Sequence, residues 1–187
     1  MKKITNTNVL RWSVIVALGG FLFGFDTAVI SGVEKHIQEL FQLSPFMHGI
    51  TISSALIGTV MGALFSGRPA DRYGRKNVLF VIAALYVISA IGSALATNVG
   101  LFIVFRLLGG IGIGASSVVA PMYIAEISPA KIRGRMTALF QFNVIFGILM
   151  AYITNFLLRD TGIEPWRWML GVEGIPAFIF FILLFLI

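Results

Sequence analysis

Six long apolar runs constrain this chain more than any other feature of its sequence. Each run is close to the ~20 residues that an α-helix needs to cross the ~30 Å of hydrocarbon in a bilayer. Because hydrocarbon offers no partner to backbone N–H and C=O groups, we expect every run to form a helix. The expected spans are residues 12–32, 47–67, 78–97, 100–121, 136–158 and 168–187. The sequence therefore predicts an all-α integral membrane protein with six transmembrane helices.

The composition agrees with this class and argues against several others. Hydrophobic residues make up 58% of the chain and charged residues 12%, whereas soluble domains carry about 25% charged residues. The net charge of +6 gathers in the connections between apolar runs, which is typical of a membrane protein and does not indicate a nucleic-acid partner. The chain has no cysteine, and the sequence contains no activated nucleophile, metal-ligating cluster or phosphate-binding loop. We therefore predict no enzyme activity, no catalytic residue, no metal site and no cofactor.

Lysine and arginine are distributed unequally between the two sets of connections. The N-terminal segment and the second and fourth connections contain Lys2, Lys3, Arg11, Arg68, Arg72, Arg75, Lys76, Lys131, Arg133 and Arg135. The other connections contain only Lys35, Arg159 and Arg167. Since basic residues concentrate in cytoplasmic loops, this distribution predicts a cytoplasmic N-terminus and a multi-pass protein of the plasma (inner) membrane.

Asp26, Arg106 and Glu173 are ionisable residues within the expected spans. At a rise of 1.5 Å per residue, each lies ~9 Å from the outer membrane face. We therefore expect the three to form one cluster in the helix interior. One interpretation is a structural ion pair that only holds helices together. The other is a proton switch, because charged residues inside a membrane are costly and commonly mark ion pathways and proton relays.

Two glycine-containing segments carry further signals. The second connection, residues 67–76, reads GRPADRYGRK. Its glycine and proline predict a tight turn at the membrane face, with Asp71 near a helix N-terminus, where the helix dipole favours negative charge. In the fourth span, Gly110 and Gly114 form a GxxxG face that predicts close helix packing. A dinucleotide-binding pattern overlaps these glycines but has no structural context between membrane spans.

Several motifs together resemble the sugar porter family of the major facilitator superfamily. They are GxxxDRxGRK in the second connection, RxxGGxGxG and PxYxxE in the fourth span and its exit, and WRWMLGxxxIPA at residues 166–177. The resemblance covers nearly the whole chain. It implies that residues 1–187 form the N-terminal six-helix half of that fold, built as a 3+3 inverted repeat, with the C-terminal half absent.

Within that family, the stretch FGFDTAVISG looks closest to the proton-coupled sugar symporters, because facilitative members typically lack the carboxylate at the position of Asp26. The resemblance implies symport of a monosaccharide, a pentose or hexose, with a proton by alternating access. Asp26 would be the proton acceptor, Arg106 its counter-charge and Glu173 a modulator of its proton affinity. Phe23 and Gln141 would contact the sugar.

The resemblance also implies a cytoplasmic charge network that steadies the outward-open state. Its members would be Gly67, Asp71, Arg72, Gly74, Arg75, Glu126 and Arg133. Two positions depart from the family pattern. Pro69 replaces an aliphatic residue often found in the loop motif. Ile148 stands seven residues after Gln141, where some members carry a second glutamine, so the choice between xylose and a hexose stays open.

The last apolar run ends the chain without a basic residue after it. We therefore expect the first half of a longer transporter, with the lipid bilayer and a second six-helix half as its partners. Two alternatives stay open. In the first alternative, the chain is a self-contained six-helix unit that dimerises to transport. In the second, it is a non-transporting sugar sensor, although a sensor usually needs a long cytoplasmic tail.

Overall fold

The computed structural model describes residues 6–187, so the predicted basic residues Lys2 and Lys3 lie outside the described part. The helices are α1 (Asn6–Val29), η1 (Ile30–Gly32), α2 (Glu34–Leu40), α3 (Pro45–Phe65), α4 (Gly67–Tyr73), α5 (Arg75–Ala94), α6 (Val99–Ile127), α7 (Arg133–Leu158), α8 (Pro165–Gly171), α9 (Gly174–Leu183) and η2 (Leu184–Leu186). Six segments are long and apolar enough to cross a membrane: Thr7–Gly32, Pro45–Phe65, Arg75–Ala94, Val99–Ile127, Arg133–Leu158 and Pro165–Leu186. The predicted all-α class with six spans is confirmed.

Several helices extend beyond the apolar runs that predicted them. α1 begins at Asn6, before the expected start at residue 12, and α5 begins at Arg75. α6 continues to Ile127 with Pro121 inside it, whereas the expected span ended at residue 121. The reason is physical: the hydrocarbon limits the apolar stretch, but backbone hydrogen bonds within a helix continue equally well in the polar layer beyond it.

The prediction of a tight turn in the second connection was wrong. The segment forms the short helix α4, in which Asp71 lies past the middle and not at a helix N-terminus. Pro69 occupies the third position of α4, where a backbone N–H has no intrahelical partner in any case. The turn itself is confined to Gly74, whose φ of 87° and ψ of 146° suit a residue without a side chain.

The final span is broken, whereas the sequence predicted one continuous helix. α8 ends at Gly171 and α9 begins at Gly174. Pro176 explains the break because it has no N–H to offer the carbonyl four residues earlier, and its ring crowds that carbonyl. The carbonyl concerned, that of Val172, instead accepts a hydrogen bond of 3.2 Å from the Ile175 N–H.

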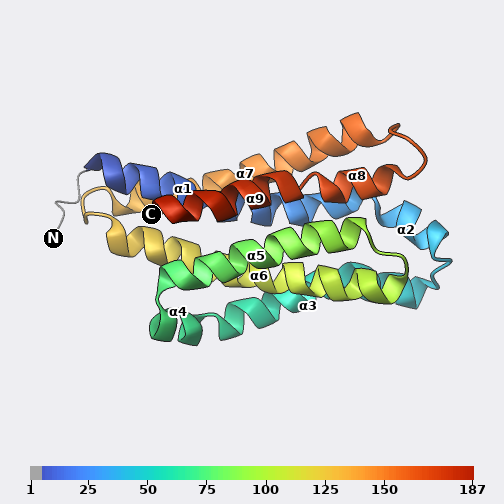
Figure 1. The fold of residues 1–187 in the computed structure, drawn as a ribbon, viewed down its shortest axis with the longest axis horizontal. Helices are drawn as coiled ribbons and strands as arrows, with labels where there is room; N and C mark the ends of the chain where they lie inside the picture. Colours follow the sequence, from blue (N-terminus) through green and yellow to red (C-terminus); the bar gives the residue numbers. More distant parts are fainter. Residues whose placement is uncertain (1–5) are drawn as a thin grey trace.

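The helices run side by side along the length of an elongated bundle (Figure 1). The beginning of α1, the helix α4 and the C-terminus lie at one end, which we call the α4 end. The helix α2 and the connection between α7 and α8 lie at the other end, the α2 end. Successive spans therefore alternate in direction, as the expected membrane topology requires.

Two pairs of helices approach so closely that their backbones touch. At the interface of α3 and α6, an added Cβ atom on Gly110 or Gly114 would collide with the carbonyl oxygen of Ala55 or Thr59, respectively. This confirms the close packing that the GxxxG pattern predicted. The pair α1 and α7 has the same kind of interface, because an added Cβ atom on Gly24 or Gly147 would collide with the carbonyl oxygen of Val144 or Phe21, respectively.

The apolar interior is divided into two clusters. The cluster nearer the α4 end includes Leu22, Tyr86, Ile113 and Ala177. The cluster nearer the α2 end includes, on the same four spans, Phe25, Val29, Ala94, Phe102 and Leu170. On α6 and the final span, a charged residue, Arg106 or Glu173, lies in sequence between the members of the two clusters, and on α1 Asp26 lies directly after Phe25, at the edge of the second cluster. The candidate site is therefore a polar layer with an apolar core on each side.

Candidate functional site

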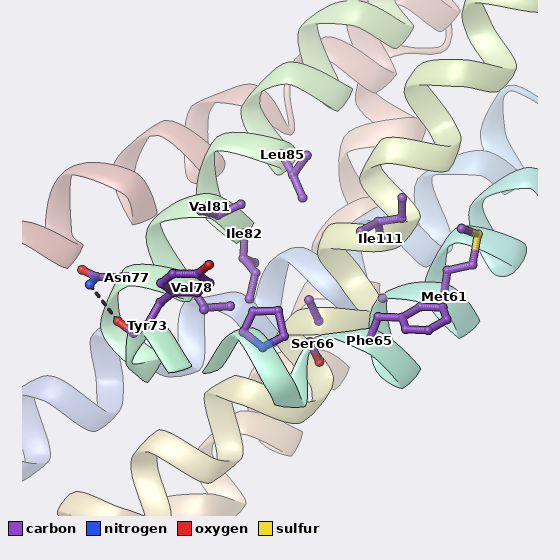
Figure 2. Close-up of a pocket in the computed structure, with 13 residues that line it drawn as sticks. Met61, Phe65, Ser66, Tyr73, Asn77, Val78, Val81, Ile82, Leu85 and Ile111 are labelled. Carbon is purple, nitrogen blue, oxygen red and sulfur yellow. Dashed lines mark hydrogen bonds between the residues drawn. The ribbon is translucent and has the colours of Figure 1, made fainter. Parts of the chain in front are cut away.

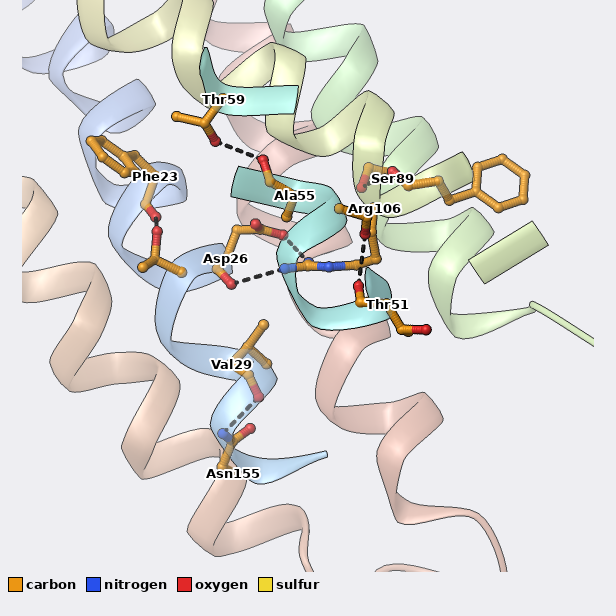
Figure 3. A network of polar contacts seen from close by, with 12 residues as sticks. Phe23, Asp26, Val29, Thr51, Ala55, Thr59, Ser89, Arg106 and Asn155 are labelled. Carbon is orange, nitrogen blue, oxygen red and sulfur yellow. Dashed lines mark hydrogen bonds and ion pairs between the residues drawn. The ribbon is translucent and has the colours of Figure 1, made fainter. Parts of the chain in front are cut away.

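A buried ion pair joins α1 to α6. The guanidinium Nη1 of Arg106 donates to Oδ1 of Asp26, and Nη2 donates to the backbone carbonyl of Asp26 at 3.5 Å. Figure 3 shows the two side chains pointing toward each other between the helices. Asp26 is 2% exposed and Arg106 3%. Charges so deeply buried are tolerated only when paired, so each residue depends on the other.

Glu173 joins this pair from the break in the final span. Its side chain is 2% exposed, and it interacts electrostatically with both Asp26 and Arg106. The structure thus brings together the three ionisable residues that the sequence placed at one depth. Asp26 keeps its second carboxylate oxygen, Oδ2, buried and without a hydrogen bond to any described residue.

Tyr86 is a polar neighbour of the cluster that the sequence analysis missed. This residue of α5 is 1% exposed, and its hydroxyl donates to the carbonyl of Gly19 at 3.4 Å. Asp26 and Glu173 both act on it electrostatically. A tyrosine in an apolar run reads as an ordinary core residue, so its proximity to the carboxylates becomes visible only in three dimensions.

The cluster combines one positive charge with two carboxyl groups. When both carboxyls are ionised, the cluster carries a net negative charge, and one added proton makes it neutral. A net charge is costly in a low-dielectric interior. The arrangement can therefore bind and release a proton, and each change alters the attraction between α1, α6 and the final span.

The two predicted sugar contacts lie on the neighbouring helices α1 and α7, at the level where Gly20 and Gly24 face the carbonyls of Phe140 and Val144. Phe23 lies on α1 and is partly buried, packed against the core. Gln141 lies on α7 and is exposed. An exposed amide in the middle of a membrane-spanning helix is unusual, because it needs polar partners that lipid does not supply.

A groove of about 670 Å³ opens between α3, α4, α5 and α6. Figure 2 shows Met61, Phe65, Tyr73 and Ile111 around it, and the lining is almost entirely apolar. It contains neither of the predicted sugar contacts. Ser66, Tyr73 and Asn77 are the polar residues of this lining, which offers few hydrogen-bonding groups to a polyhydroxylated ligand.

The predicted charge network at the α4 end is formed in part. Arg75 binds Asp71 at 2.8 Å and Glu126 at 3.0 Å, and so links α4, α5 and α6. Arg133 instead donates to the carbonyl of Ser128 at 3.4 Å. The Arg72 guanidinium carbon lies 5.4 Å from the ring centroid of Tyr73. Of the predicted glycines, Gly74 has the positive φ, while Gly67 begins α4 in open space.

Two further polar residues tie helices together and were not predicted. Asn155 of α7 is 7% exposed and donates through Nδ2 to the carbonyl of Val29 at 3.1 Å (Figure 3). Arg167 of α8, interpreted from the sequence as a loop cation, donates to carbonyls at the end of α5. Their partners are backbone atoms distant in sequence, which no local pattern reveals.

Within residues 6–187, the structure has no group of three or more His, Cys, Asp or Glu residues that could hold a metal ion. Within the cluster, Asp26 is paired with Arg106, which supplies a positive charge beside the carboxylate.

Comparisons with known proteins agree with the geometry. The family described as "Sugar (and other) transporter" matches residues 12–187. A protein named "Glucose transport protein" from Synechocystis sp. is 44% identical over 96% of this chain and 41% of its own length. An "Arabinose-proton symporter" from Bacillus subtilis is 42% identical over 96% of this chain and 40% of its own length.

A solved structure resembles the fold throughout. It is that of the proton:xylose symporter XylE, from E. coli, bound to 6-bromo-6-deoxy-D-glucose. The two chains superpose with a TM-score of 0.92 and 35% identity, covering 98% of this chain and 46% of the other. This chain spans about two-fifths of the length of the two curated relatives.

Proposed function

We propose a function that proceeds from one established point: the chain belongs to the family of sugar (and other) transporters. It is a multi-pass membrane protein of the major facilitator fold. The proposal is that it forms the six-helix half of a monosaccharide:proton symporter that carries the proton site. The sugar is a pentose or hexose, as the names of the arabinose, xylose and glucose transporters among its relatives suggest.

The observation that carries the proposal is the buried cluster of Asp26, Arg106 and Glu173. Asp26 accepts the transported proton, Arg106 serves as its counter-charge, and Glu173 modulates its affinity for the proton. When Asp26 is protonated, its attraction to Arg106 weakens, and the helices that carry the two residues become free to rearrange. A proton thereby shifts the population between two conformations, which is the basis of coupling.

The exposed amide of Gln141 supports a sugar site at the surface of this half. Amide groups donate and accept hydrogen bonds with sugar hydroxyls, and an aromatic ring such as that of Phe23 covers an apolar sugar face. Because only 17% of the apolar window of α7 is buried within the described chain, a second six-helix half that covers α7 would complete the site. Substrate sites between two such halves are general in transporters of this architecture.

The α4 end of the bundle is cytoplasmic in this proposal, and the membrane is the plasma (inner) membrane. The basic residues of α4 and of the connection between α6 and α7 support this orientation. The contacts of Arg75 with Asp71 and Glu126 hold three helices together at that end. Their role is to steady the state in which the cytoplasmic side is closed.

The proton role is tested by Asp26→Asn in the complete transporter, reconstituted in liposomes. We expect uphill sugar accumulation driven by a proton gradient to be lost, while downhill sugar exchange continues, because exchange needs no net proton movement. Asp160→Asn is the matched control, since the Asp160 side chain is 85% exposed. Proton-driven sugar accumulation by the Asp26→Asn variant would refute the proton role of Asp26.

The sugar contact is tested by Gln141→Ala. We expect sugar binding, measured by calorimetry or ligand-induced fluorescence change, to weaken by about 1–3 kcal/mol through the lost hydrogen bonds. Asn143→Ala on the same helix is the control, because the Asn143 amide already donates to its own helix at the Leu139 carbonyl, at 2.9 Å. If the Gln141→Ala variant and the unaltered protein bound the sugar with equal affinity, Gln141 would not be a sugar contact.

A further inference from the structure

Arg167 makes an unusually complete set of contacts near the start of α8. Its Nη1 donates to the carbonyls of Ala94 at 2.7 Å and Ala96 at 3.1 Å. Its Nε donates to the Glu164 carboxylate at 2.8 Å. The guanidinium carbon also lies 4.4 Å from the ring centroid of Trp166. One side chain thus connects α8, the segment before it and the end of α5.

The contacted carbonyls belong to a helix end that needs partners. α5 ends at Ala94, and the last carbonyls of any helix lack intrahelical donors. A positively charged donor at a helix C-terminus satisfies these carbonyls and interacts favourably with the helix dipole. The hydrogen bonds of Arg167 therefore connect α8 to the C-terminal end of α5, at the α2 end of the bundle.

Because the final span is broken near Pro176, the position of Glu173 depends on how α8 is held against α5. α8 is only seven residues long and is separated from α9 by the break, so the packing of α9 does not by itself orient α8. Glu173 lies two residues after the end of α8 and six residues after Arg167. An added Cβ atom on Gly171 would lie 3.4 Å from the Ala94 side chain, so α8 rests closely on α5 between the two residues.

We propose that Arg167 is a positioning residue for the proton site. By clamping α8 onto the end of α5, it holds Glu173 against Asp26 and Arg106 without touching any of them. The inference rests on the proposed function, in which Glu173 modulates the proton affinity of Asp26. The charged and titratable groups around Glu173 are Asp26 on α1, Arg106 on α6 and Tyr86 on α5.

Arginine suits this clamp better than lysine does. Its planar guanidinium presents several donors in a rigid fork, so one side chain reaches two carbonyls and a carboxylate at once. A lysine in the same place offers a single ammonium group on a flexible stem. Arg167→Lys is therefore a conservative variant that keeps the charge and loses part of the geometry.

The test compares pH profiles of proton-coupled sugar accumulation in the complete transporter. The variants are Arg167→Gln, Glu173→Gln and the two combined, with Arg159→Gln as the control. The Arg159 side chain is 59% exposed and binds the neighbouring Asp160, so it has no part in the clamp. We expect Arg167→Gln to move the pH midpoint in the same direction as Glu173→Gln, by about one unit, a tenfold change in proton affinity.

The combined variant decides the mechanism. If Arg167 acts through Glu173, the double variant has the same midpoint as Glu173→Gln alone, because neighbours that share one effect are not additive. Arg167→Lys should lie between the unaltered protein and Arg167→Gln. Shifts that add in the double variant, or an Arg167→Gln midpoint equal to that of the control, would overturn the proposal.

Hydrogen exchange separates this inference from the proposed function. A pH-independent uptake by the unaltered transporter would contradict proton coupling itself. The clamp is then judged by amide exchange in residues 165–171 and 91–96, which should lose protection in Arg167→Gln and keep it in Arg159→Gln. Unchanged protection in Arg167→Gln would show that Arg167 does not hold α8, and would refute the clamp whatever the transport result.

Discussion

The helix pairs α3–α6 and α1–α7 are both packed through glycines that face backbone carbonyls of the partner helix. The two pairs are joined to each other by a buried ion pair. In the pair α3 and α6, Gly58 and Gly62 face carbonyls of α6, while glycines of α6 face α3. In the pair α1 and α7, Gly20 and Gly24 face the carbonyls of Phe140 and Val144. Gly147 of α7 in turn faces the carbonyl of Phe21. The inverted repeat relates the two pairs, since α1 corresponds to α6 and α3 to α7.

The charged residues connect the two pairs and do not lie within either. Asp26 belongs to the pair α1 and α7, and Arg106 to the pair α3 and α6. Backbone-to-backbone packing has one best arrangement and resists change, because interiors are packed nearly as densely as crystals. An ion pair responds to a single proton. Each helix pair is therefore held by close backbone packing, whereas the ion pair of Asp26 and Arg106 crosses from one helix pair to the other.

The largest expected effect follows from removing the link between the pairs. Arg106→Leu leaves Asp26 and Glu173 buried without a counter-charge, which we expect to destabilise the protein by about 3–5 kcal/mol. Thermal unfolding in detergent measures the loss. Asp26→Leu combined with Arg106→Leu should recover part of it, because the most costly unpaired charge is then gone. A single Arg106→Leu variant as stable as the unaltered protein would contradict the account.

The glycine interfaces should come next. Gly24→Ala and Gly114→Ala each drive a Cβ atom into a backbone carbonyl of the facing helix, and such overpacking costs about 1–3 kcal/mol or more. Gly49→Ala is the matched control, because nothing lies within 4 Å of its added Cβ atom. Similar losses of thermal stability for the two interfaces would support their equivalence. If alanine lowered the thermal stability at one interface and not at the other, the two interfaces would not be equivalent.

The smallest effect concerns a polar contact found in only one of the two pairs. Asn155 links α7 to the Val29 carbonyl of α1. Asn155→Ala should lower stability by about 0.5–1.5 kcal/mol, the usual net value of one hydrogen bond. Thr154→Ala serves as the control, since the Thr154 hydroxyl bonds only within its own helix. A loss as large as that of Gly24→Ala would mean that this amide, and not the glycines, holds the pair.

The sequence predicted those features that depend on one helix at a time. Apolar length predicted the six spans, and the spacing of Gly110 and Gly114 predicted a close helix contact. Counting residues from the ends of spans was enough to place Asp26, Arg106 and Glu173 at one depth, because helical rise is constant.

Features that depend on tertiary contacts between residues distant in sequence were not predicted. The carbonyls bound by Arg167 and the position of Tyr86 beside the carboxylates follow from how the helices pack. The helical form of α4 was missed because proline and glycine were interpreted as turn residues without regard to their positions in a helix. Pro176 was a visible signal for the break in the final span, and it was not used.

The aromatic surroundings of Trp166 give the bundle a built-in optical reporter. Trp166 is 1% exposed, with the rings of Phe41 and Phe102 each 6.4 Å from its own and the Arg167 guanidinium over its face. Indole emission depends on local polarity and on nearby charge. Replacing Trp12 and Trp168 by phenylalanine would leave Trp166 as the single tryptophan of this chain, so that a movement of α8 could be followed in real time by selective excitation of its indole, without any attached label.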